Sequence, residues 1–119
     1  MPVTAQQPKL NCKDPGPQME FTLCAQQDYE RADKALNAQY ALTRKEAKKR
    51  DVEGGEGYNE SEKTLIAAQR AWVAYRDAHC EAYSYQVNGG SMQPQVMADC
   101  EADLTRKRTE ELKKMYDIN

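Results

Sequence analysis

Four cysteines and one histidine are the residues of this chain best suited to covalent or metal chemistry. The cysteines are Cys12, Cys24, Cys80 and Cys100, and the histidine is His79. Zinc sites prefer closely spaced ligands such as C-x-x-C, whereas successive cysteines here lie 12, 56 and 20 residues apart. An even cysteine count in a short chain favours disulfides over reduced core cysteines or a metal site. Disulfides imply an oxidising compartment.

Enzymatic chemistry has few candidate residues. Any Ser-His-Asp or Cys-His site would have to use His79, and cysteines in disulfides cannot act as nucleophiles. Because His79 adjoins Cys80 on an apolar stripe, we expect a packed or boundary histidine. We therefore predict no catalytic residues, no metal ligands and no cofactor. A pair of carboxylates remains the one catalytic arrangement that the sequence leaves open.

The composition indicates a single small domain spanning residues 1–119. The chain has 13.5 kDa, 30% charged residues and a mean hydropathy of −0.96, so its apolar residues must be concentrated on helix faces. Seventeen basic and nineteen acidic residues give a net charge of −2. This balance gives no global attraction to nucleic acid or anionic lipid. No apolar run approaches the roughly 20 residues of a membrane span.

Proline and glycine positions divide the chain into an arm and three helices. Residues 1–18 contain four prolines and are predicted to form an irregular arm. Residues 19–50 contain neither proline nor glycine and predict an amphipathic helix. Its buried stripe is expected to be Ala25, Tyr29, Ala32, Leu36, Tyr40, Thr43 and Ala47.

A glycine-rich loop over residues 51–57 separates this helix from the next one. The second helix is predicted over 59–87 and begins at a capping-box-like pair, Asn59 and Glu62. We expect it to be central, with a wide apolar face. The stripe on that face is Leu65, Ala68, Trp72, Tyr75, His79 and Ala82, flanked by Ile66, Val73 and Cys80.

A turn at residues 88–91 leads into the third helix, predicted over 92–115. The run Asn88-Gly89-Gly90-Ser91 supplies a left-handed C-cap followed by a possible N-cap, and Pro94 suits the first turn of the following helix. The third stripe is Val96, Met97, Cys100, Leu104, Arg108, Leu112 and Met115. The predicted fold class is therefore all-α, a small three-helix antiparallel bundle with an irregular N-terminal arm, stapled by two disulfides.

The helical hairpin also suggests how the cysteines pair. Cys80 lies about eight residues before the turn and Cys100 about ten after it. They would meet across antiparallel helices and leave Cys12 to join Cys24. The two other pairings stay open at this point.

The segment AQRAWVAYRDAHC, residues 68–80, resembles the signature helix of the LprI-type family of lysozyme inhibitors. The early cysteine pair, the Gly89-Gly90-Ser91 turn and Cys100 also agree. The motif positions are Asp33, Asn37, Gln69, Arg70, Trp72, Tyr75, Arg76, Asp77 and Arg108. The resemblance covers most of the chain. It implies a bacterial protein that is secreted, periplasmic or lipid-anchored. We expect the free periplasmic or secreted form, with its signal peptide removed, because no lipobox cysteine precedes the domain.

Several motif side chains form either a recognition surface or a stabilising network. We expect the ring of Trp72 in the core. Arg76 should pair across the bundle with Asp33 or another carboxylate, and Arg108 needs such a partner because it falls within an apolar stripe.

The second turn is the preferred contact edge for a protein partner, because it combines tyrosines with adaptable polar groups. Its residues are Tyr83, Tyr85, Asn88, Gly89, Gly90, Ser91 and Met92. A plain helical-hairpin turn is the alternative interpretation. A second candidate is the acidic loop, which contains Asp51, Glu53, Glu56 and Glu60. Its carboxylates would attract a basic lysozyme. A solvated linker is the alternative interpretation of this loop.

The resemblance implies inhibition of lysozyme for some members of the family, and we expect this protein to be a stoichiometric inhibitor that blocks the cleft of lysozyme or another peptidoglycan hydrolase. One alternative is an immunity protein against a toxin delivered into the periplasm. Another is an envelope protein without inhibitory activity that binds cell-wall polymer or a partner protein. Neither nucleic acid nor a membrane span is expected, and the oligomeric state does not follow from the sequence.

Overall fold

The computed structural model describes residues 10–57 and 59–117 of the chain. The first nine residues of the predicted arm lie outside this part. The described residues contain no strand, and their helices are α1 (Gln18–Glu53), α2 (Ser61–Ser84) and α3 (Gln93–Lys114), with a short 3₁₀ helix, η1 (Tyr85–Val87), after α2. The predicted all-α fold is confirmed, and the helix bounds lie within three residues of those expected.

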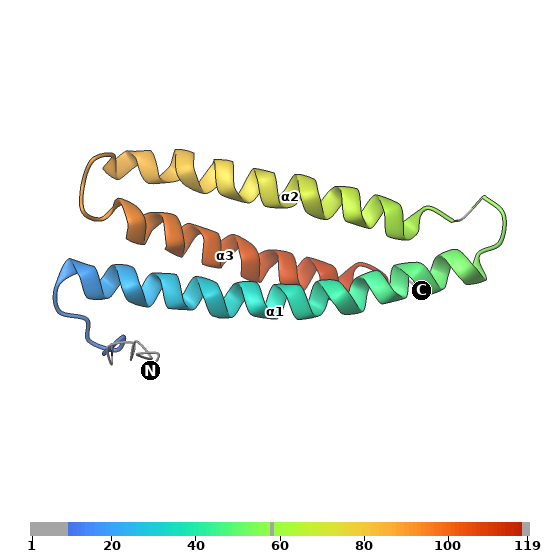
Figure 1. Cartoon of the computed structure of the whole chain (residues 1–119), viewed down its shortest axis with the longest axis horizontal. Helices are drawn as coiled ribbons and strands as arrows, with labels where there is room; N and C mark the ends of the chain where they lie inside the picture. The colour runs from blue at the N-terminus through green and yellow to red at the C-terminus, as the bar shows by residue number, and fades with distance from the viewer. Residues whose placement is uncertain (1–9, 58, 118–119) are drawn as a thin grey trace, which may run out of the picture.

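The three helices lie side by side in a long, thin molecule measuring 58 × 41 × 29 Å (Figure 1). Helix α2 runs antiparallel to the other two, whereas α1 and α3 run in the same direction. Gln18 accordingly meets Gln95 near the starts of α1 and α3, and Thr43 meets Leu112 further along both helices. The starts of α1 and α3 and the end of α2 therefore lie together at one end of the bundle.

The most extensive helix contact joins α1 and α3, and small residues on both helices build it. The predicted stripe of α1 is confirmed, with Ala25, Ala32, Leu36, Thr43 and Ala47 buried. The buried residues of α3 are likewise small apart from one leucine: Ala98, Ala102, Thr105, Thr109 and Leu112. Small side chains let the two backbones approach closely. Of the predicted α3 stripe only Leu112 is fully buried, and the other members are partly buried.

The predicted stripe of α2 is largely wrong. Ala68, Tyr75, His79 and Ala82 are exposed, and the rings of Tyr75 and His79 stack at 5.3 Å on the outside of the helix. Trp72 does pack, partly buried, against the core cluster. The buried residues of α2 are mostly polar: Leu65, Gln69, Arg76, Cys80 and Ser84. These polar side chains can be buried because other side chains in the interior provide hydrogen-bond partners for them.

Two disulfides connect the elements and confirm the predicted pairing. Cys12 joins Cys24, with Cα atoms 5.7 Å apart, and so ties the described part of the arm to α1. Cys80 joins Cys100, with Cα atoms 5.5 Å apart, and links α2 to α3. The other two pairings, reduced cysteines and a zinc site are thereby excluded.

The start of α2 is capped from α1. The predicted Asn59 and Glu62 cap is wrong, because α2 begins at Ser61 and its N-cap residue makes no side-chain capping bond. The carboxylate of Asp51 instead accepts hydrogen bonds from the backbone N–H groups of Ser61 at 2.7 Å and Glu62 at 3.0 Å.

Helices in the described part of the chain are too short or too polar to cross a membrane.

Candidate partner-binding surface

The end of the bundle at the α2–α3 connection carries an unusual concentration of exposed apolar side chains. Eight large hydrophobic residues are exposed among the described residues, and five of them lie at this end. We call this surface the hairpin end and define it by the predicted contact residues Tyr83, Tyr85, Asn88, Gly89, Gly90, Ser91 and Met92, together with Met19 and Phe21 at the start of α1.

All seven predicted contact residues are exposed, and the structure brings them together with the first turn of α1. The exposed fractions of Tyr83, Tyr85 and Met92 are 52%, 53% and 45%. Exposed aromatic and methionine side chains are the types enriched where proteins bind other proteins. The hairpin end therefore has the composition of a protein contact surface.

Polar side chains hold the turn in one conformation. Gly89 adopts a positive φ of 77°, as the predicted left-handed cap requires. The amide oxygen of Gln93 accepts the N–H of Gly89 at 3.3 Å, and its amide nitrogen donates to Ser84 Oγ at 3.3 Å. Ser84 Oγ in turn donates to the carbonyl of Glu81 at 2.7 Å. A preformed turn lowers the ordering cost of binding.

Sequence reasoning missed Gln93 and Ser84, because each looks like an ordinary polar residue near a turn. It also missed the bond that attaches α1 to this end, in which the amide nitrogen of Gln18 donates to Gln95 Oε1 at 2.8 Å. A signal was present in retrospect, since three glutamines lie close to the ends of the predicted helices. Their partners depend on how α1 and α3 pack, which the sequence pattern does not give.

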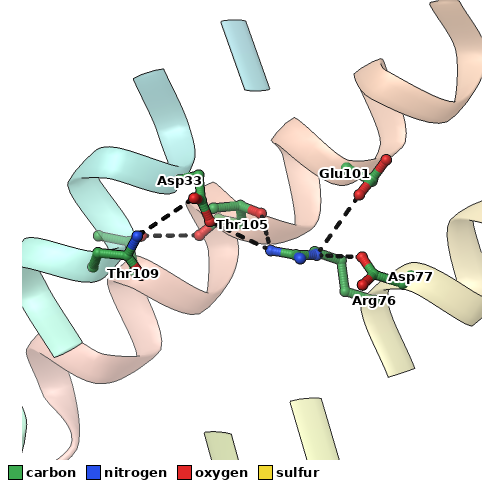
Figure 2. Close-up of polar contacts among 7 residues, drawn as sticks. Asp33, Arg76, Asp77, Glu101, Thr105 and Thr109 are labelled. Atoms are coloured by element: carbon green, nitrogen blue, oxygen red, sulfur yellow. Dashed lines mark hydrogen bonds and ion pairs between the residues drawn. The ribbon is translucent and has the colours of Figure 1, made fainter. Parts of the chain in front are cut away.

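Arg76 lies at the centre of a polar network to which all three helices contribute side chains (Figure 2). Its side chain is only 7% exposed, and three carboxylates surround it: Asp77 at 2.9 Å, Asp33 at 3.7 Å and Glu101 at 4.0 Å. Its Nη1 donates to Thr105 Oγ1 at 3.4 Å. The predicted pairing with Asp33 is confirmed, although Asp77 is the nearer carboxylate.

Two aromatic rings complete the surroundings of Arg76. The guanidinium carbon lies 5.3 Å from the ring centre of Tyr29 and 5.1 Å from that of Trp72, within the range of cation–π attraction. Burial raises the pKa of Tyr29 to about 12, although Arg76 opposes the shift. Arg76 thus joins all three helices, and its role in this arrangement is structural.

The other motif residues are divided between the interior and the surface. The Nε of Arg108 donates to Gln69 Oε1 at 3.0 Å, and its Nη1 lies 3.4 Å from Glu111 Oε1. Its Nη2 is buried without a hydrogen-bond partner among the described residues. On the surface, Asn37 donates to Asp33 at 3.4 Å, whereas Arg70 is simply exposed.

One of the four acidic-loop residues, Asp51, stabilises the fold, and the other three do not contribute to the cap. Asp51 caps α2, and the N–H groups of Glu62 and then Ser61 hold the pKa of its carboxyl below the usual range. Glu53, Glu56 and Glu60 are exposed. Among residues 10–57 and 59–117 no group of three or more potential metal-binding side chains is found.

Known proteins that are similar in sequence to this chain include a family of inhibitors and an uncharacterized relative. The family model described as "Lysozyme inhibitor LprI" matches residues 11–112, which include all four cysteines, the Arg76 network and the turn. An uncharacterized protein of Rhizobium meliloti (strain 1021) is 42% identical over 119 residues, covering 98% of this chain and 86% of the relative. No solved structure matches significantly. The chain belongs to the LprI family of lysozyme inhibitors.

Proposed function

We propose that this protein acts in the periplasm or outside the cell as a stoichiometric inhibitor of lysozyme, and that its hairpin end covers the cleft of the enzyme. The match of residues 11–112 to the lysozyme inhibitor family carries the first part of the proposal. The two disulfides support the location, because such bonds persist in oxidising compartments.

The choice of the hairpin end depends on its shape and composition. It lies at one end of an elongated bundle, where the end of α2 meets the starts of α1 and α3 (Figure 1), and it presents exposed Tyr83, Tyr85 and Met92. The bonds of Gln93 hold the turn between them in place. A preformed and partly aromatic surface at the end of a bundle suits a concave enzyme cleft at a low ordering cost. Inhibition of this kind breaks no covalent bond and needs no cofactor.

The test compares matched surface variants in a lysozyme turnover assay. Tyr83→Ser combined with Met92→Ser removes two exposed apolar groups from the hairpin end. The control, Leu42→Ser with Val52→Ser, removes two groups that are 63% and 79% exposed elsewhere on α1. We expect the first variant to inhibit roughly thirtyfold more weakly, the size of one interface hot spot of about 2 kcal/mol, and the control to match the wild type.

Two results would contradict the proposal in different ways. Equal inhibition by both double variants would remove the hairpin end as the contact surface. If several lysozyme types stay fully active at a large molar excess of the wild-type protein, inhibition itself is ruled out. Melting temperatures equal to that of the wild type would show that both variants are folded.

A further inference from the structure

A groove between α1 and α3 lies beside the hairpin end, and none of the functions above has used it. Its volume is about 400 Å³. Pro94 and Met97 contribute apolar surface from α3, and Tyr29 contributes its ring from α1. Pro94 follows Met92 by two residues, so the groove continues the hairpin-end surface along the bundle.

Two carboxylates and the amide of Gln26 line this mostly apolar groove. Glu101 lies within it on α3 and is only 13% exposed, and Glu30 is exposed on α1. None of the ion pairs in the described residues includes Glu30, although Lys34 follows it by one helical turn. The groove thus combines apolar surface with one exposed and one largely buried carboxylate.

The charge behind the groove is also unbalanced. Arg76 is the single cation of its network, and it faces three carboxylates, those of Asp33, Asp77 and Glu101. The pKa of Glu101 is raised above its usual range, chiefly by burial and then by the hydrogen bond and charge of Asp77. The positive charge of Arg76 opposes this shift. The three carboxylates around Arg76 therefore outnumber the one cation of this network among the described residues. An added cation would relieve this excess.

We infer that this groove receives a lysine or arginine side chain of the inhibited enzyme, with its methylene stem on Pro94 and Met97 and its cationic head between Glu30 and Glu101. The inference rests on the proposed function for the identity of the partner. Long basic side chains bury their stems along apolar surface and keep the charged head at a polar edge. Lysozymes are often basic, so such side chains are plentiful on the partner, and complementary charge also speeds encounter.

The first arm of the test probes the groove without lysozyme. We would label the methionine methyl groups with ¹³C and titrate the intact protein with N-acetyl-lysine methylamide, using N-acetyl-norleucine methylamide as the uncharged probe. The Met97 signal should shift with the lysine probe, and Glu30→Gln with Glu101→Gln should weaken that response at least threefold or so. Equal shifts with the two probes, or no shift with either, would overturn the inference.

The second arm measures lysozyme affinity and its dependence on salt. We expect Glu30→Gln to weaken binding roughly threefold and Glu101→Gln roughly tenfold, with a smaller loss of affinity on adding salt than in the wild type. Glu110→Gln, an equal charge change at an exposed position near the end of α3 and outside every candidate surface, should leave affinity unchanged. Equal affinity of the wild type and the double Gln variant would contradict the inference.

The two arms separate failure of the groove from failure of the proposed function. If the Met97 signal responds to the lysine probe but the wild type does not bind lysozyme, the proposed function fails and the cation preference of the groove stands. If lysozyme binds the wild type and the double Gln variant with equal affinity, the groove is not used for inhibition. Glu30→Gln keeps this test valid on its own, because an exposed glutamine cannot unfold the bundle.

Discussion

The carboxylate of Asp51, in the last turn of α1, accepts the backbone N–H of Ser61, the first residue of α2, at 2.7 Å. A second bond, from the N–H of Glu62 at 3.0 Å, uses the other oxygen. One side chain thus caps α2 and closes the glycine-rich loop. These bonds also hold the pKa of Asp51 below its usual range.

We predict that Asp51→Ala lowers the melting temperature at pH 7, because it leaves two helix-start N–H groups without their acceptor. Since the folded pKa is depressed, this stabilisation is complete above the usual pKa of aspartate, about 4, and is lost as pH falls through the folded pKa. The melting temperatures of the wild type and Asp51→Ala should therefore differ at pH 7 and become equal in acid. A constant difference at every pH would contradict the cap.

Removing Asp33 tests the network around Arg76. Asp33→Ala should destabilise the protein by about 1 kcal/mol or less, since Asp33 is half-exposed and Asp77 remains beside Arg76. The control is Glu53→Ala, which removes an exposed carboxylate of α1. The melting temperature of the Asp33 variant should be the lower of the two. Equal melting temperatures would show that the 3.7 Å pair contributes nothing to stability.

The disulfide between α2 and α3 should be a main source of stability. Replacing Cys80 and Cys100 together by alanine releases a constraint between residues 20 apart in sequence. The loop-entropy account predicts a loss of about 3 kcal/mol. Urea unfolding measured without reductant would give this value, and an unchanged midpoint would contradict the account.

Burying the ionised carboxylate of Glu101 lowers the free energy of unfolding at neutral pH. Its folded pKa is raised, chiefly by burial and then by Asp77, so stability falls as pH rises from the usual glutamate pKa towards the folded value. We therefore predict that Glu101→Gln melts at the same or a higher temperature than the wild type at pH 7. This advantage should vanish below about pH 4, where both side chains are neutral. A clear drop in melting temperature at pH 7 would mean that Glu101 mainly stabilises Arg76.

Helix α1 shows how much of this fold the sequence predicts, and α2 shows where the prediction fails. The stripe of α1 is correct because its inward residues, such as Ala32 and Leu36, are apolar. In α2 the inward residues include Gln69 and Arg76, and alanines face outward. Apolar periodicity cannot find a buried face whose side chains are satisfied by partners on other helices.

The candidate surface was predictable in part. The turn residues from Tyr83 to Met92 could be identified from composition, and the structure exposes them as expected. The bonds of Gln93 and the groove around Glu101 could not be identified, because both depend on the packing of α3 against the other helices. The parallel course of α1 and α3 brings Glu30 and Glu101 to one groove, although they lie far apart in sequence.

The measurement that tests the central claim most directly is a titration of lysozyme turnover with the oxidised wild-type protein, at an enzyme concentration well above the dissociation constant. We predict that activity falls linearly and reaches its minimum at one molecule of inhibitor per molecule of enzyme. Full activity at a tenfold molar excess, with several lysozyme types, would contradict the account.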